Sequence, residues 1–191
     1  MRDKPAVLGR MPLIIVVTLL IVSGCATFST RSDSYKLSDD YFIEIRDNED
    51  PFVMDHFYQL NGYLKENDYK GVVEEATEGI DSIPKYAELF SYFYAMRGYA
   101  NIMLYNLEKG FEDITNLQEF DKESSMIPGL WTYYYFSYAP FDTDPKKYYL
   151  KAKESLVQWR SARPRNTFEV VFSDPARIAE MEKVINDELR K

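Results

Sequence analysis

The sequence offers few side chains for covalent or metal chemistry. Its 191 residues include one cysteine, Cys25, and one histidine, His56. A single cysteine cannot form an internal disulfide, and one Cys with one His cannot supply the ligand set of a structural zinc site. The sequence also has no glycine-rich phosphate loop and no metal-ligand spacing. It therefore predicts no metal, no nucleotide and no other cofactor.

Carboxylates are the remaining candidates for catalysis. Two carboxylates held about 5–9 Å apart in a cleft can hydrolyse a glycosidic bond. The acids Glu74, Glu78 and Glu112 fall on stretches that we expect to be the outer faces of helices, where charged residues are normally solvated. Hydrolase activity is therefore the most remote of the functions considered, and we expect the protein not to be an enzyme. His56 is expected to be structural or exposed.

Composition excludes another class of function. Asp and Glu number 31 against 23 Lys and Arg, which gives a net charge of −8. Nucleic-acid binding depends on clustered basic residues, so no nucleic acid is expected as a partner. Apolar residues make up 46% of the chain and aromatic residues 16%, which is enough for one domain with its own core.

The N-terminal segment, from Met1 to Cys25, has the order of an export signal. Basic residues precede an uncharged apolar run over 11–22, which is too short to span a bilayer but suits the apolar region of a signal peptide. The sequence Val22-Ser23-Gly24-Cys25 follows, and it resembles the lipobox of bacterial lipoproteins. The resemblance implies cleavage before Cys25 and acylation of this cysteine, palmitate included. An ordinary signal peptide or a short buried helix is the alternative interpretation.

This resemblance gives the expected organisation of the chain. Residues 1–24 form the signal peptide, 25–50 a polar lipidated tether, and 51–191 a folded domain. Loss of 1–24, with three basic residues and one acidic residue, leaves a net charge of −10. Ala26 after the cysteine favours, by resemblance, an outer-membrane lipoprotein that faces the periplasm.

The folded part has the start signals of helices. Asp50-Pro51, Asp144-Pro145 and Asp174-Pro175 each place a capping residue before a proline, which predicts helices that begin near 51, 145 and 175. Breaks are expected at Asn67-Asp68, at Asn106 and at Pro128. Apolar residues alternate over 167–172, which favours an extended connector rather than a sheet.

An internal repeat is more informative. Val72, Gly110 and Tyr148 recur with a period of 38 and occupy the same place in three similar segments. The middle segment, with Gly98 and Gly110 at its small positions, resembles a tetratricopeptide repeat. The sequence thus predicts an all-α fold, a short solenoid of about three helix-turn-helix units with a C-terminal capping helix. A helical bundle without repeats is the alternative.

The same resemblance implies a binding groove lined by the first helix of each unit. The positions that it assigns to groove binding are Phe57, Asn61, Tyr92, Tyr99, Tyr133 and Ser137. Such tyrosines suit an extended peptide or a partner helix, so the expected role is a membrane-anchored scaffold that binds an envelope protein. They can equally fill the core between helices, and the sequence leaves both roles open. The alternatives are a small-molecule or lipid-binding accessory protein of a transport system and, more remotely, an envelope hydrolase.

Overall fold

A computed structural model describes residues 51–83, 90–165, 169, 172–173 and 175–191. The chain divides into two units, Met1–Leu37 and Ser38–Lys191, and all described residues belong to the second. The lipobox, Cys25 and the tether therefore lie outside the described residues. Every regular element within these ranges is helical, with no strand.

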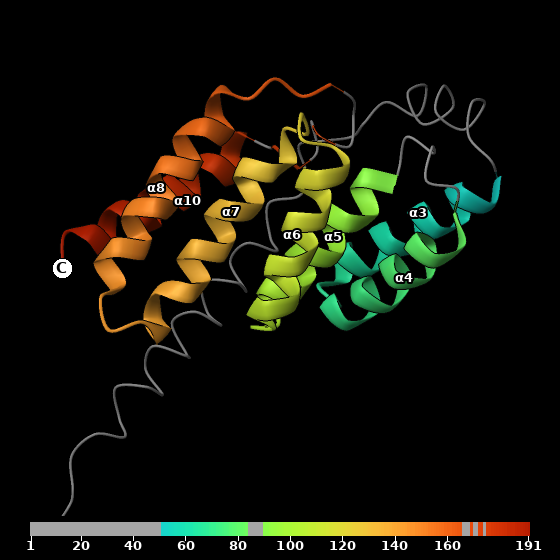
Figure 1. Cartoon of the computed structure of the whole chain (residues 1–191), viewed down its shortest axis with the longest axis horizontal. Helices are drawn as coiled ribbons and strands as arrows, with labels where there is room; N and C mark the ends of the chain where they lie inside the picture. Colours follow the sequence, from blue (N-terminus) through green and yellow to red (C-terminus); the bar gives the residue numbers. More distant parts are fainter. Residues whose placement is uncertain (1–50, 84–89, 166–168, 170–171, 174) are drawn as a thin grey trace, which may run out of the picture. The chain divides into compact units, whose positions relative to one another are not determined.

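Seven α-helices and one short 3-10 helix follow one another along the described part of the chain (Figure 1). Their bounds are α3 Pro51–Glu66, α4 Tyr69–Ser82, α5 Phe90–Met103, α6 Leu107–Phe120, α7 Met126–Tyr138, η2 Ala139–Phe141, α8 Pro145–Ser161 and α10 Pro175–Leu189. Each α-helix from α4 to α8 packs against the one before it, α10 packs against α8, and α5 also contacts α7. The all-α prediction is confirmed.

Three of the helices begin where the capping signals placed them. Helices α3, α8 and α10 start at Pro51, Pro145 and Pro175. Asp144 caps α8 by accepting a hydrogen bond from the backbone N–H of Lys147. A proline causes no conflict at these positions because the first N–H groups of a helix have no partner within the helix.

The second helices of the three pairs begin in one register. Their N-cap residues are Asp68, Asn106 and Asp144, which recur with the same period of 38. The helices before α4 and α6 also end alike. Asn67 and Tyr105 adopt the left-handed conformation with φ values of 57° and 60°, and each is the turn residue of a Schellman-type helix end. The third connection differs, because η2 replaces that turn.

Two expectations for local structure are wrong. Pro128 does not break a helix, because it lies in the first turn of α7, where a proline is tolerated. The segment around 167–172 is not extended at its described residues. Glu169 and Phe172 are helical, and the N–H of Ser173 donates to the carbonyl of Glu169 over 3.0 Å. Apolar alternation over so short a stretch does not distinguish a strand from a buried turn of helix.

Close helix contacts depend on small residues. At the crossing of α5 and α6, a Cβ added at Gly98 would lie 3.1 Å from the Cβ of Asp113, and one added at Gly110 would lie 2.8 Å from Cγ1 of Ile102. Gly129 of α7 has the same role against Trp159 of α8, whose indole carbon would be 2.6 Å away. The core is continuous from α3 to α10, with Leu60, Phe93, Leu130 and Ile185 fully buried.

Candidate functional site

The first helices of the three pairs lie side by side, and predicted groove residues make the contacts between them. At the α3–α5 step, the rings of Phe57 and Tyr92 are 5.5 Å apart, and the Tyr92 hydroxyl donates to Asn61 Oδ1 over 3.0 Å. At the α5–α7 step, the rings of Tyr99 and Tyr133 are 5.0 Å apart. The structure thus brings these five predicted residues together in two clusters.

Burial shows what these side chains do. Phe57, Tyr92 and Tyr133 are only 3–4% exposed and belong to the core. Burial raises the pKa of both Tyr92 and Tyr133, so their hydroxyls stay neutral. Asn61, Tyr99 and Ser137 are partly exposed, and Ser137 lies one turn beyond Tyr133 on α7. Three of the six residues therefore have the core role that the sequence left open.

The chain itself covers the α5–α7 cluster. Phe172, from the connection between α8 and α10, is 2% exposed and packs its ring against Tyr99, Tyr133 and Trp159 at centroid distances of 6.2, 6.4 and 5.4 Å. A peptide that bound to Tyr99 and Tyr133 would have to displace this ring. The sequence predicted an extended connector and a closing helix here, but not that a ring of the connector would cover Tyr99 and Tyr133.

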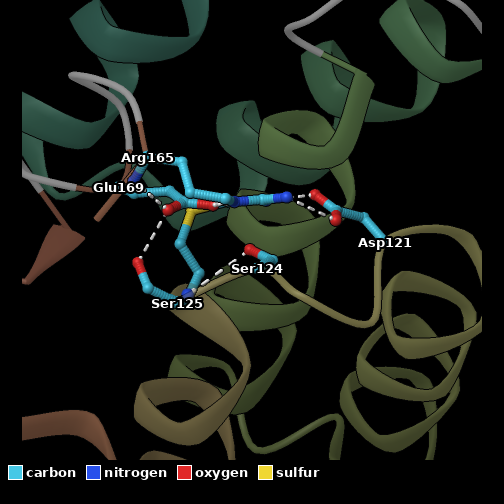
Figure 2. A network of polar contacts seen from close by, with 6 residues as sticks. Asp121, Ser124, Ser125, Arg165 and Glu169 are labelled. Carbon is cyan, nitrogen blue, oxygen red and sulfur yellow. Dashed lines mark hydrogen bonds and ion pairs between the residues drawn. The ribbon is translucent and has the colours of Figure 1, made fainter. Parts of the chain in front are cut away.

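A polar network holds the connection in place (Figure 2). The carboxylate of Glu169 is 1% exposed, and it accepts hydrogen bonds from the backbone N–H and the guanidinium of Arg165 and from the hydroxyl of Ser125. Arg165 also bonds the carboxylate of Asp121, before α7. Burial opposes ionisation of Asp121, but the hydrogen bonds from Arg165 outweigh it and hold its pKa below the ordinary value. We call Asp121, Ser125, Arg165 and Glu169 the Arg165 network.

Two polar contacts, each to a buried carboxyl group, join the helices within the first two helix pairs. His56 Nδ1 of α3 lies 2.6 Å from Glu75 Oε1 of α4, and the two side chains are 7% and 8% exposed. Arg97 of α5 donates to Asp113 of α6 over 2.7 Å, and Asn101 donates to the same carboxylate. Burial raises the pKa of Asp113. These roles were not recognised in the sequence, although the 38-residue register gave a signal, since it aligns Glu75 with Asp113.

The acids considered for catalysis are dispersed. Glu74, Glu78 and Glu112 are exposed, the first two on α4 and the third on α6. Among the described residues, no group of three His, Cys, Asp or Glu side chains is placed to hold a metal ion.

Aromatic side chains gather on the opposite side of α7 from Tyr133. Residues of a helix advance by about 100° each, so positions 131, 134, 135 and 138 share one stripe. Trp131 stacks on Tyr135 at 5.4 Å, and Tyr134 stacks on Tyr138 at 5.9 Å. A residue from each neighbouring helix extends the stripe, and all its members are partly or largely exposed. We call this set the α7 aromatic surface: Phe111, Trp131, Tyr134, Tyr135, Tyr138 and Tyr148.

Basic residues border the α7 aromatic surface. Lys151 Nζ lies 5.2 Å from the ring of Tyr135 and 5.1 Å from that of Tyr148, and Lys147 Nζ lies 5.7 Å from Tyr148. Loss of hydration raises the pKa of Tyr148, and the charge of Asp142 adds to the rise. The phenol of Tyr148 is therefore a neutral hydrogen-bond donor. Aromatic rings with nearby cations are typical of protein-binding surfaces.

Comparisons of the chain with protein-family models, with curated proteins and with solved structures return no match.

Proposed function

We propose that the protein is a lipid-anchored scaffold of the bacterial cell envelope, with a tetratricopeptide-like domain that binds another envelope protein. The arrangement of the helix pairs carries this proposal. The first helices α3, α5 and α7 contact one another through Phe57, Tyr92, Tyr99 and Tyr133, and each is followed by a helix capped in the same 38-residue register. Stacked helix pairs of this kind form extended surfaces that bind proteins.

The anchor in this proposal is the acylated Cys25. Within the described part of the chain, every helix is too short or too polar to cross a bilayer. Several acyl chains on one cysteine hold a protein stably at a membrane, because each buried methylene contributes about 0.8 kcal/mol. Tethering also raises the effective concentration of the domain for other membrane-bound proteins. By the resemblance at Ala26, the outer membrane, with the domain in the periplasm, is the proposed location.

Fractionation of a bacterial envelope tests the anchor. The full chain should sediment with outer membranes, and Cys25→Ser should move it to the soluble fraction. Cys25→Ser that remains in the membrane pellet would refute the lipid anchor. Ser23→Thr is a suitable control, since it changes the neighbourhood of the cleavage site and keeps the thiol.

In-cell crosslinking tests the scaffold role. A photoreactive phenylalanine at Phe111, which is 46% exposed, should capture the same envelope protein in independent preparations. The same group at Val157 of α8, which is 59% exposed and outside the α7 aromatic surface, should not capture it. Equal capture at both positions, or none at either, would contradict the proposal.

A small-molecule or lipid-binding role is the second candidate. The buried hydroxyl of Tyr133 has no hydrogen-bond partner among the described residues, and a bound ligand could provide one. Native mass spectrometry of the soluble Cys25→Ser chain would detect such a ligand as an added mass. Loss of that mass in Tyr133→Phe would support this second role.

A further inference from the structure

The third helix pair breaks a pattern that the first two share. In the 38-residue register, the positions of Glu75 in α4 and Asp113 in α6 correspond to Lys151 in α8. The two acids are buried, and each contacts a basic residue of the preceding helix, His56 and Arg97 respectively. The third pair has a cation in this position instead of an anion.

Lys151 has no anionic partner among the described residues. The preceding helix, α7, presents tyrosine rings to it, and the ammonium group lies within 5.2 Å of two of them. A ring face stabilises an ammonium group by about 0.5–1 kcal/mol at an exposed site, but it leaves the positive charge without a counter-charge. Two other cations on α8 have polar partners, since Lys153 bonds Asn186 and Arg160 pairs with Glu182.

The charge around the α7 aromatic surface differs from that of the whole chain. Residues 145–153 contain four lysines and no acid, in a protein whose net charge is −8. Carboxylates flank this stretch: Asp142, whose charge acts on Tyr148, Asp144, which caps α8, and Glu154, whose charge acts on Tyr135. Lys151 is the cation that lies beside two rings of the surface, Tyr135 and Tyr148, whereas Asp144 is bonded to the backbone of its own helix.

From this pattern we infer that the α7 aromatic surface binds an acidic segment of the partner protein, in which a carboxylate pairs with Lys151 and neighbouring apolar side chains pack on Trp131 and Tyr135. The inference rests on the proposed scaffold role and names the chemistry of its partner. The carboxylate would give the third helix pair a contact between an acid and a base, as the first two already have. Apolar contacts to exposed rings provide affinity, and the charge selects the partner.

Two fluorescein-labelled peptides test this inference. Both carry the same Phe and Leu anchor residues, separated by glutamates in one peptide and by lysines in the other. Fluorescence anisotropy with the soluble full-length Cys25→Ser protein should show binding of the acidic peptide at least about tenfold tighter than that of the basic one. Equal affinities, or tighter binding of the basic peptide, would overturn the inference.

Matched charge reversals locate the site. Lys151→Glu should weaken binding of the acidic peptide by about tenfold or more. Lys153 lies on the same helix but is bonded to Asn186, so Lys153→Glu should change the affinity for this peptide by less than about twofold. Circular dichroism shows whether each variant is folded. If Lys151→Glu does not fold, Lys151→Gln provides the same test. Equal losses at 151 and 153 would count against the site.

Intrinsic fluorescence gives an independent readout. The chain has two tryptophans, of which Trp159 is 1% exposed and Trp131 lies on the α7 aromatic surface. The acidic peptide should protect the fluorescence of Trp131 from quenching by acrylamide, and Trp131→Ala should abolish this protection. Protection by phosphatidylglycerol vesicles but not by the acidic peptide would show a membrane-binding surface instead and overturn the inference.

Self-association is the remaining alternative. The chain would then dimerise in a concentration-dependent way, Trp131→Ala and Lys151→Glu would abolish the dimer, and no peptide would bind. This result would also overturn the inference. The proposed scaffold function fails separately, through the fractionation of Cys25→Ser and the crosslinking at Phe111.

Discussion

The guanidinium group of Arg165 donates two parallel hydrogen bonds to the carboxylate of Asp121, over 2.9 and 2.5 Å, although 44 residues separate them in sequence. This bidentate pair joins the connection that follows α8 to the loop that precedes α7. It thereby fixes the segment whose Phe172 covers Tyr99 and Tyr133. Two of the predicted groove residues, Tyr99 and Tyr133, are consequently covered by the chain's own residues.

Asp121→Asn tests the ion pair through its pH dependence. The folded-state pKa of Asp121 lies below its ordinary value of 3.8, so the stabilisation is complete above that value and is lost as the pH falls through the folded pKa. We expect Asp121→Asn to lower the free energy of unfolding by up to about 1 kcal/mol at pH 7. Urea unfolding between pH 7 and acid pH should show this difference shrink at low pH. A difference that grows on acidification would contradict the assignment.

Phe172→Ala tests the buried ring of the same connection. The change should destabilise the protein by about 3–5 kcal/mol, because it leaves a cavity between Tyr99, Tyr133 and Trp159. Phe141→Ala is the matched control, since that ring is 66% exposed and should contribute less than about 0.5 kcal/mol. Denaturant midpoints measure both. Similar small losses would show that Phe172 is not a core residue.

The buried pair of His56 and Glu75 gives a third test. Glu75→Ala removes one partner and leaves a buried imidazole without its hydrogen bond, which should cost about 2–4 kcal/mol. Glu74→Ala, one residue earlier and exposed, should change stability by less than about 0.5 kcal/mol. Thermal unfolding of both variants measures the contrast. Equal effects would mean that the pair does not contribute to the fold.

Two glycines should respond in opposite directions to alanine. Gly110→Ala places a methyl group 2.8 Å from Cγ1 of Ile102. The resulting strain should outweigh the gain in helix propensity and lower the free energy of unfolding by about 1 kcal/mol. Gly62→Ala in α3 meets no atom within 4 Å, so it should stabilise the helix by about 0.5–1 kcal/mol. Free energies of unfolding from urea titrations measure the two signs. A stabilising Gly110→Ala would show that α5 and α6 are not held at this distance.

The sequence predicted the helices but not all of their contacts. Caps before prolines identify α3, α8 and α10 because the signal is local, and the 38-residue register reflects turns that repeat at Asn67 and Tyr105. The predicted groove residues do meet, yet Phe57, Tyr92 and Tyr133 are buried. The burial of Tyr133 could not be predicted because it depends in part on Phe172, which comes from a distant part of the chain.

The polar contacts between helices, such as that of His56 with Glu75, were not predicted from the sequence for a related reason. Glu75 and Glu74 are adjacent acids with identical chemistry, and only the packing of α3 on α4 makes one a buried partner of His56 and leaves the other in solvent. The α7 aromatic surface was also not predicted from the sequence. Its tyrosines were visible in sequence, but consecutive aromatic residues give no preference for either side of a helix.

The close crossing of α5 and α6 at Gly98 and Gly110 bears on the order of folding. Its contacts span a short turn, so little chain entropy is lost when they form, whereas docking of Glu169 on Ser125 closes a loop of 44 residues. Structure should therefore develop first around α5 and α6, with the Arg165 network completed last. Substitutions at Arg165 or Glu169 should then accelerate unfolding with little change in the refolding rate.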